Sequence, residues 1–405
     1  AVPFVSEAGG HSPRAPLPQL LPQGPAELRH LGDAQRGARD LTRQLQRESP
    51  AQGGAGGREE PLTWSEYLFE ELAAHTCIFA FFYASFAYNG IFVWRILPAT
   101  GKEALQYPFA AAFNVAWALA VWCWLQAHWE DPGAVPGRWR EFVLKVGDGL
   151  TVTQAQRAWQ PGVATLCGQC GIIRPERAHH CRVCGTCYLR LDHHCPFLKN
   201  CVGLNNHKHF LLLLTYGALT SFIALGTTFP DFIRLGASYL RLAVGLDWQA
   251  PDVGTVDAAF LLALGGIAAC ASMVLTPMVF FHFALASCNQ TKIENSYSNM
   301  PNPYDLGTTF DNLPQIFGAP GLDWPFPVRP WRPLADGVAF PRGDIVYEDG
   351  VASPRSPQSP QSPSARSAAE TEQLWRIRYR VPFKPFGQSD AMPMPSAACG
   401  GCFGW

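Results

Sequence analysis

Apolar residues along this chain gather into four blocks, and the stretches between the blocks are polar. Two blocks fall within residues 74–128 and two within residues 209–285, where residues 229–257 separate the third block from the fourth. Each block is long enough to cross a hydrocarbon core of about 30 Å as a helix. The pattern therefore predicts four transmembrane helices. The alternative, buried helices of a water-soluble protein, is hard to reconcile with four such blocks in one chain.

Lysine and arginine are distributed unevenly around these blocks. Residues 98–106 carry one lysine and residues 229–257 carry two arginines. Most of the other basic residues lie before the first block, between the second and the third, and after the fourth. The positive-inside rule therefore places both termini and residues 131–208 in the cytosol, and it makes residues 229–257 a lumenal loop.

The cytosolic segments differ in composition. Residues 1–62 are rich in Pro, Gly, Gln and Arg and are expected to be disordered, and residues 346–405 form a low-complexity tail with Ser-Pro repeats. Residues 286–345 form a C-terminal cytosolic segment, with a compact piece at 302–318. Because the chain begins with Ala1 and shows no cleavable signal, we expect its natural start to lie upstream.

Composition narrows the possible partners. Only 16% of the residues are charged and the formal net charge is −1, so the chain lacks the basic field of a nucleic-acid-binding protein. Low charge together with apolar blocks is typical of a membrane protein, which makes the lipid bilayer the expected partner and excludes nucleic acid.

The cysteines are clustered. Seven of the 13 lie between Cys167 and Cys201, together with four histidines, and the first 76 residues contain none. This distribution favours metal thiolates in a reducing compartment over a disulfide framework. Zinc takes four tetrahedral ligands, so two sites of three cysteines and one histidine would use six of the seven. Spacing alone does not decide between His179 and His180, or between His193 and His194.

One cysteine of the cluster is therefore left over. Cys195 lies next to a histidine and before Pro196, and Asp192 is close in sequence. A free thiol beside such groups can have a depressed pKa and act as a thiolate nucleophile. The alternative is a spare thiol in a zinc-binding interaction module.

The motif Asp192-His193-His194-Cys195, in a cysteine-rich segment between two pairs of predicted transmembrane helices, resembles the DHHC protein S-acyltransferases, or palmitoyltransferases. The resemblance covers roughly residues 107–318. It includes the Asp-Pro-Gly motif at 131–133, the run RPERAHHCRVCGTC, the segment KNCVG, and Asn312, which in that family anchors the C-terminal segment.

The resemblance implies a fold class, namely an α-helical integral membrane protein with a cytosolic, cysteine-rich domain of short β-hairpins between helices 2 and 3. It implies two structural Zn²⁺ ions, one held by Cys167, Cys170, His180 and Cys187 and the other by Cys181, Cys184, His194 and Cys201. It makes Cys195 the nucleophile, His193 the base that activates it and Asp192 the group that orients His193. Arg174, Arg177 and His179 are expected to meet the phosphates of CoA.

The implied reaction is a ping-pong transfer. A fatty acyl group passes from palmitoyl-CoA or another long-chain acyl-CoA to Cys195, and from there to cysteines of membrane-associated proteins. The expected location is the Golgi, the endoplasmic reticulum or the plasma membrane. Cys399 and Cys402 in the tail are themselves candidates for acylation.

Three positions depart from the family pattern. Phe197 stands where the family usually has Trp, Lys199 where it has Asn, and Lys292 where the Thr-Thr-x-Glu motif has its second threonine. Because that threonine tends to brace the active site by hydrogen bonding, its loss motivates an alternative function, a catalytically weak, zinc-bearing membrane scaffold.

Overall fold

The computed structural model describes residues 63–246, 253–343 and 366–381. Four of its helices are long and apolar enough to cross a membrane, which confirms the number expected. They are Trp64–Ala99, Glu103–Trp129, His207–Ala243 and Thr255–Ser287. The remaining expectations for residues 1–62 and for Cys399 and Cys402 lie outside the described residues.

The first spanning helix is built from three pieces. It begins as α2 (Trp64–Ser85), continues as a π-helical stretch, η1 (Phe86–Ile96), and ends in α3 (Leu97–Ala99). Thr63 and Glu66 form a capping box, in which each side chain accepts the other's backbone N–H. This cap starts α2 ten residues before the expected boundary at 74, and it brings acidic residues into the first turns of the helix.

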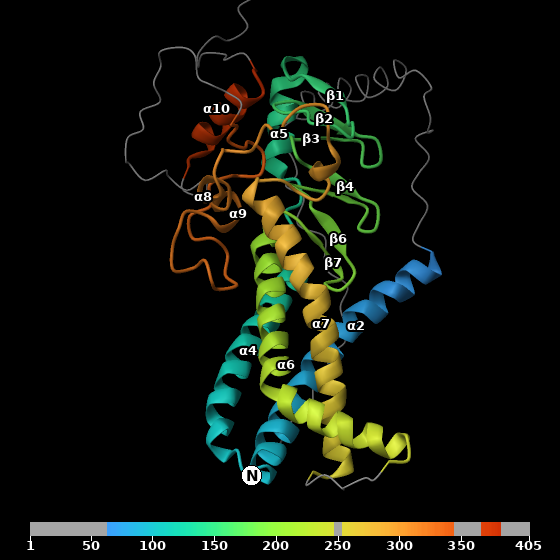
Figure 1. Ribbon diagram of the computed structural model, residues 1–405. Helices are drawn as coiled ribbons and strands as arrows, with labels where there is room; N and C mark the ends of the chain where they lie inside the picture. The colour runs from blue at the N-terminus through green and yellow to red at the C-terminus, as the bar shows by residue number, and fades with distance from the viewer. Residues whose placement is uncertain (1–62, 247–252, 344–365, 382–405) are drawn as a thin grey trace, which may run out of the picture.

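The third helix, α6 (His207–Ala243), is longer than expected and contains Pro230. Its last part turns sideways at the end of the molecule remote from the strands (Figure 1). The interval 229–257, which we expected to be a lumenal loop, is therefore partly helical. The apolar block ends at Phe229, but the helix continues because buried Asp231 forms ion pairs with Lys102 at 2.8 Å and Arg234 at 3.3 Å.

The spanning helices share one apolar core. It joins η1, α4 (Gln106–Trp129), α6 and α7 (Thr255–Ser287). Tyr88 stacks on Phe113 with ring centroids 3.9 Å apart. Asn89 and Asn114 exchange side-chain hydrogen bonds of 3.0 and 2.8 Å between η1 and α4, so these two intramembrane amides satisfy one another.

The segment between α4 and α6 folds into a small domain of hairpins. After α5 (Gly137–Val146) and η3 (Gly147–Gly149), seven short strands form three sheets. They are β1 (Val152–Gln154), β2 (Ala164–Cys167) and β3 (Ile172–Arg174) in the first sheet, β4 (His179–Cys181) with β5 (Thr186–Tyr188), and β6 (His193–Cys195) with β7 (Asn200–Val202). Figure 1 shows the sheets in succession toward the long helices, with β6 and β7 nearest to them. The expected fold class, helices 1 and 2, a hairpin domain, then helices 3 and 4, is confirmed.

The C-terminal segment returns to this domain. After α7 come the 3-10 turn η4 (Glu294–Ser296) and the short helices α8 (Thr309–Asn312) and α9 (Pro314–Phe317). Another 3-10 turn, η2 (Glu103–Leu105), precedes α4. Buried Asn312 donates to Ser287 O at 2.8 Å and accepts from Leu306 N at 2.9 Å, so it ties the segment to the end of α7.

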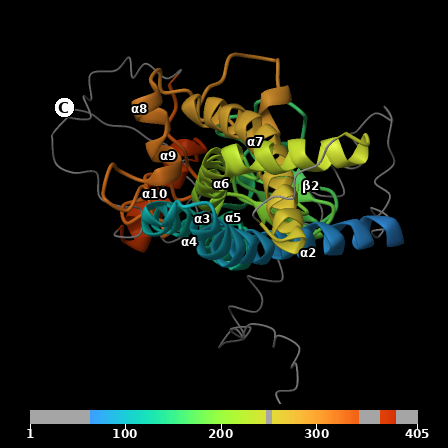
Figure 2. The same cartoon turned by 60° about the horizontal axis from the view of Figure 1, so that its bottom comes forward.

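A further helix, α10 (Ala368–Arg378), lies in the interval 346–405, where we expected only a low-complexity tail. Ser367 and Glu370 form its capping box, and Trp375 and Tyr379 pack on Trp139 of α5. Figures 1 and 2 both show α8, α9 and α10 together on one side of the molecule. Aromatic contacts and a cap thus contribute to folding a short stretch whose surroundings in the sequence are polar.

Arg378, the last residue of α10, neutralises a carboxylate inside the hairpin domain. Its Nε and Nη2 each lie 2.6 Å from an oxygen of Glu176, whose side chain is fully buried. Tyr304 Oη and the backbone N–H of Gly162 donate to the same carboxylate at 2.8 and 2.6 Å. Of these three donors, Arg378 carries the positive charge that balances the buried carboxylate of Glu176.

We predict that Arg378→Ala lowers the free energy of unfolding by about 3–5 kcal/mol, because Glu176 stays buried without a counter-charge. The control is Lys145→Ala, which removes an exposed pair between α5 and Glu372 of α10 and should change stability by less than about 1 kcal/mol. Thermal or denaturant unfolding in detergent measures both. Equal, small effects would show that α10 does not contribute through this ion pair.

Candidate functional site

The cysteine-rich domain contains a repeat that the sequence interpretation missed. Cys167, Cys181 and Cys195 recur every 14 residues, and so do His180 and His194. Each of these three cysteines precedes a tight turn with a left-handed residue four positions later. These residues are Gly171, Gly185 and Lys199, with φ of 64°, 61° and 50°. The second cysteine of each turn is Cys170, then Cys184, but Leu198 in the third repeat.

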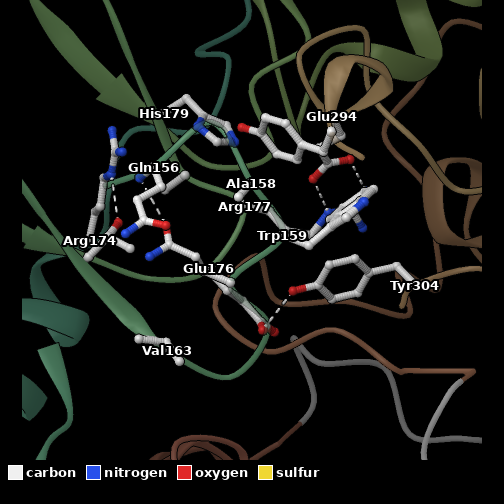
Figure 3. Close-up of a pocket in the computed structure, with 14 residues that line it drawn as sticks. Gln156, Ala158, Trp159, Val163, Arg174, Glu176, Arg177, His179, Glu294 and Tyr304 are labelled. Atoms are coloured by element: carbon white, nitrogen blue, oxygen red, sulfur yellow. Dashed lines mark hydrogen bonds and ion pairs between the residues drawn. The ribbon is translucent and has the colours of Figure 1, made fainter. Parts of the chain in front are cut away.

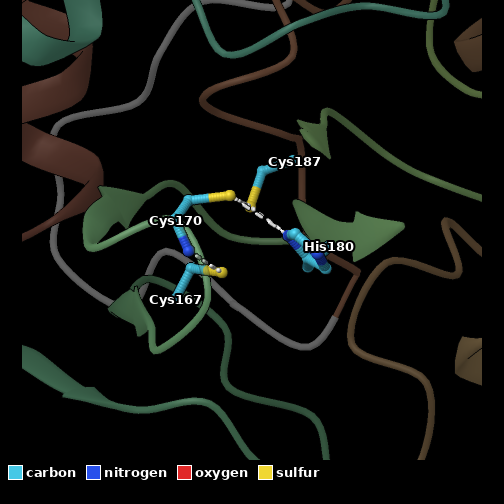
Figure 4. A group of neighbouring side chains, drawn as sticks. All are labelled: Cys167, Cys170, His180 and Cys187. Atoms are coloured by element: carbon cyan, nitrogen blue, oxygen red, sulfur yellow. Dashed lines mark hydrogen bonds between the residues drawn. The ribbon is translucent and has the colours of Figure 1, made fainter. Parts of the chain in front are cut away.

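The first two repeats build two clusters of candidate metal ligands. In each cluster the four ligand atoms, three Sγ and one imidazole nitrogen, lie within 4.8 Å of one another. The clusters are Cys167, Cys170, His180 and Cys187, and Cys181, Cys184, His194 and Cys201. These are the eight residues that the resemblance named, and Figure 4 shows the first group converging from two hairpins.

Strand geometry explains the interleaved order. His180 pairs with Cys187 across β4 and β5, and His194 pairs with Cys201 across β6 and β7, so each pair points to one face. Adjacent residues of a strand point to opposite faces, which sends Cys181 away from His180 and into the next cluster. Every cluster therefore joins one hairpin to the turn of the preceding one. Three thiols and one imidazole, buried or half-buried, fit a tetrahedral thiophilic ion in a closed site.

The third repeat supplies a different arrangement. His193 Nδ1 lies 2.7 Å from Asp192 Oδ2, and the backbone N–H of Lys292 donates to Asp192 Oδ1 at 2.7 Å. Burial opposes ionisation of Asp192, but the hydrogen bond from His193 and the nearby positive charges outweigh it and lower the pKa of Asp192. Burial likewise opposes protonation of His193, but hydrogen bonds to Asp192 and Cys195 prevail and raise the pKa of His193 to about 9.

Cys195 lies where the hairpin domain meets the long helices. It is 7% exposed and packs in one apolar cluster with Trp124 of α4 and with Phe210 and Leu214 of α6. Its neighbour two positions away, His193, shares its face of β6 and places its ring against Phe210, with centroids 5.1 Å apart. The thiol is thus held between an imidazole and the apolar side chains of two spanning helices.

Asn200 fixes the β6–β7 hairpin to the membrane helices, a role that the sequence interpretation did not assign. Its Nδ2 lies 3.0, 3.1 and 2.9 Å from the carbonyl oxygens of Ala127, His128 and Glu130, at the end of α4. These carbonyls have no partners within the helix. Asn200 begins β7 and lies at least 70 residues after these carbonyls in the chain, so no local sequence signal indicated such a cap.

Lys292 contributes to the site through its backbone. Thr291 and Glu294 cap one turn reciprocally, with Glu294 N donating to Thr291 Oγ1 at 3.2 Å and Thr291 N donating to Glu294 Oε2 at 2.9 Å. This turn directs the N–H of Lys292 at Asp192. The exposed lysine side chain takes no part in that bond, so the missing threonine leaves the brace on Asp192 in place.

Arg177 forms a buried ion pair with Glu294. Its side chain is 1% exposed, and its Nε and Nη2 lie 2.7 Å from the two carboxylate oxygens of Glu294. Its Nη2 also donates to Asn289 O at 2.8 Å. A CoA phosphate would have to displace Glu294 to reach this guanidinium. The ion pair therefore favours a structural role for Arg177, and its contact with CoA phosphates stays an untested expectation.

The other two expected phosphate contacts border a small pocket of about 30 Å³ (Figure 3). Arg174 is buried and donates to Thr165 Oγ1 at 2.9 Å. Burial, reinforced by the charge of Arg174, lowers the pKa of His179 to about 4, so this imidazole is neutral near pH 7. The pocket has room for about one water molecule, so an anion would reach these groups only at its rim.

Comparison with known proteins places these features in one family. A family model described as DHHC palmitoyltransferase matches residues 162–299. Probable protein S-acyltransferase 12 of Arabidopsis thaliana is 30% identical over 240 residues, which cover 58% of this chain and 79% of that protein. Palmitoyltransferase ZDHHC15A of Danio rerio is 27% identical over 278 residues, or 63% and 79%. Palmitoyltransferase ZDHHC2 of Homo sapiens is 33% identical over 186 residues, or 44% and 47%.

We predict that Arg177→Ala destabilises the protein by about 3–5 kcal/mol, because Glu294 is left as an unpaired buried charge. Arg177→Lys should recover only part of this loss, since an ammonium group cannot bind both carboxylate oxygens in the plane. Arg140→Ala, on the exposed face of α5, is the control and should change stability little. Unfolding midpoints in detergent give the comparison. Weaker acyl-CoA binding at unchanged stability would instead restore the phosphate role.

Proposed function

The chain belongs to the DHHC palmitoyltransferase family, and we propose that it carries a long-chain fatty acyl group from acyl-CoA, as a thioester on Cys195, to cysteines of membrane-associated proteins. Its relatives are named palmitoyltransferases or protein S-acyltransferases, and the chain is accordingly a multi-pass membrane protein with acyltransferase activity. One observation carries the residue assignment. Cys195 is the cysteine of the repeat that enters neither metal cluster, and it lies beside His193.

The reaction needs a base that accepts and returns one proton. His193 takes the proton from Cys195 Sγ, and the thiolate attacks the acyl-CoA carbonyl carbon. The bond from that carbon to the CoA sulfur breaks, and the departing CoA thiolate takes up the proton. In the second half, His193 removes the proton of a substrate thiol, whose sulfur attacks the acyl-enzyme, and Cys195 regains the proton. One thioester replaces another in each half, so no further reactant is required.

Asp192 orients the base. Its two oxygens are occupied by His193 and by the backbone N–H of Lys292, so the carboxylate cannot rotate without losing one of the bonds. An ionised Asp192 stabilises the imidazolium that forms when Cys195 loses its proton. This geometry favours an enzyme over the scaffold alternative, which rested on the missing threonine side chain.

The acyl chain belongs on the membrane side of Cys195. The side chains that pack around this thiol come from α4 and α6, which are spanning helices. Burying one methylene contributes about 0.8 kcal/mol, so a long chain gains most by lying among these helices while its thioester meets Cys195. Palmitoyl-CoA or a similar long-chain acyl-CoA is the substrate that this position suits.

The two clusters are proposed to hold structural Zn²⁺, since three thiolates and one imidazole in a closed set are a frequent zinc site. Each ion, when bound, would tie one hairpin to the next. The charged rim around Arg174 and His179 is the proposed contact for CoA phosphates, without Arg177. The hairpin domain and both termini are proposed to face the cytosol, in the endomembrane system or the plasma membrane.

The decisive experiment is incubation of purified protein with labelled palmitoyl-CoA. Wild-type protein should acquire hydroxylamine-sensitive label, and Cys195→Ser should acquire none while it keeps both metal ions, since Cys195 lies in neither cluster. Cys288→Ser, which alters an exposed cysteine at the end of α7, is the matched control and should label normally. Loss of one metal equivalent in Cys195→Ser would mean that this thiol is a ligand.

Lys292 offers a second test, because its side chain and its N–H can be separated. Lys292→Ala should transfer acyl groups at the wild-type rate. Lys292→Pro removes the N–H that bonds Asp192 at a first-turn position where proline is tolerated. A hydrogen bond to a charged group contributes about 1.5–3 kcal/mol, so we expect a rate loss of about tenfold to a hundredfold with unchanged metal content. If Lys292→Ala transferred acyl groups slowly, the lysine side chain and not its backbone N–H would be responsible for the effect on Asp192.

A further inference from the structure

The first turns of α2 present acidic side chains to the cysteine-rich domain. Glu66 forms an ion pair with Arg182, in the turn between β4 and β5, and Glu71 forms one with Lys199, in the turn between β6 and β7. Glu70, between them, is buried although it carries a carboxylate. Figure 1 shows α2 passing close to the β6–β7 end of the hairpin domain.

Glu70 faces a residue of the second metal cluster. Its Oε1 lies 3.0 Å from His194 Nε2. The other ring nitrogen of His194, Nδ1, faces the three thiols of that cluster. Its distances to the Sγ atoms of Cys181, Cys184 and Cys201 are 3.7, 3.4 and 3.5 Å. The imidazole therefore bridges the thiols on one side and a carboxylate of a spanning helix on the other.

This arrangement determines which ring nitrogen of His194 carries the hydrogen when the cluster holds a metal ion. A histidine that binds a metal through Nδ1 carries its hydrogen on Nε2, and a carboxylate beside Nε2 stabilises this tautomer and the ring orientation. Glu70 Oε1 lies at ion-pair distance from that nitrogen of His194. The carboxylate also makes the imidazole a stronger electron-pair donor to the metal ion. Glu66 pairs with Arg182 in the turn of the second metal cluster, which holds α2 beside His194.

We propose that Glu70 is a positioning residue for the second metal cluster, through which the first spanning helix orients His194 and, with it, the strand that carries Cys195. The inference rests on the proposed function only in taking the ion to be zinc. Because His194 and Cys195 are adjacent in β6, a rotated or loosened His194 would also displace the nucleophile.

A separate contact of α2 reaches the turn on the other side of Cys195. Lys199 stands in the left-handed position that glycine occupies in the two preceding turns, with φ of 50°. A non-glycine residue there is strained unless its surroundings hold it. Its ion pair with Glu71 and the nearby ring of Tyr67, 6.0 Å from Nζ, provide such surroundings from the same helix.

The test measures release of zinc from the full-length protein in detergent to a coloured chelator. Wild-type protein should release two ions at slow rates. In Glu70→Gln, which keeps the shape and removes the charge, one ion should leave about 10-fold to 100-fold faster and the other at the wild-type rate. Glu71→Gln is the matched control on the same turn of α2. It breaks the pair with Lys199 but leaves the Glu70 carboxylate beside His194 Nε2, so release should be unchanged.

A second measurement distinguishes a change at one metal site from a general loss of stability. With Co²⁺ in place of zinc, Glu70→Gln should alter the ligand-field bands of one ion, whereas Glu71→Gln should alter neither. Wild-type release rates and spectra in Glu70→Gln would overturn the proposal, and so would equal acceleration of both ions or equal effects of the two variants. A wild-type protein that binds no zinc would contradict the proposed metal instead, and so the two failures are distinguishable.

Discussion

Adjacent residues of a β-strand point to opposite faces, and the functional site depends on this alternation in β6. His194 faces the thiols of a metal cluster, while His193 and Cys195 face the spanning helices. A metal ion in that cluster would fix the strand on one side and leave His193 and Cys195, the proposed base and nucleophile, on the other. The third repeat has Leu198 in place of the second turn cysteine, so the thiol of Cys195 enters neither cluster, as its proposed role as nucleophile requires.

Buried charges connect this strand to the C-terminal segment. Asp192 accepts from the turn that Glu294 caps, Glu294 binds Arg177, and the neighbouring carboxylate of Glu176 binds Arg378 of α10. Such pairs rarely add stability over apolar residues of similar volume, but breaking one is costly because the remaining charge stays buried. The network therefore acts mainly to hold one arrangement of segments far apart in the sequence around Asp192.

The sequence predicted the four helices because apolar length is a local property. The eight residues that gather into clusters came from the family resemblance, since spacing alone left the choice between His179 and His180, and between His193 and His194, open. It failed where a contact from elsewhere decides the outcome. α6 continues beyond its apolar block because Lys102 pairs with Asp231, and α10 folds because Trp139 receives Trp375. Arg177 belongs to a basic stretch, and nothing local shows that Glu294 occupies it.

Lys292 is a case in which the sequence suggested the loss of an interaction that the structure retains. A motif records side chains, and the loss of a threonine there suggests a lost hydrogen bond, yet the bond that Asp192 accepts comes from the backbone. What the turn must conserve is its shape, which Thr291 and Glu294 secure by capping one another. Any residue except proline at the position between them supplies the N–H. The family pattern and this chain therefore differ in a side chain while they keep the interaction on which the orientation of His193 depends.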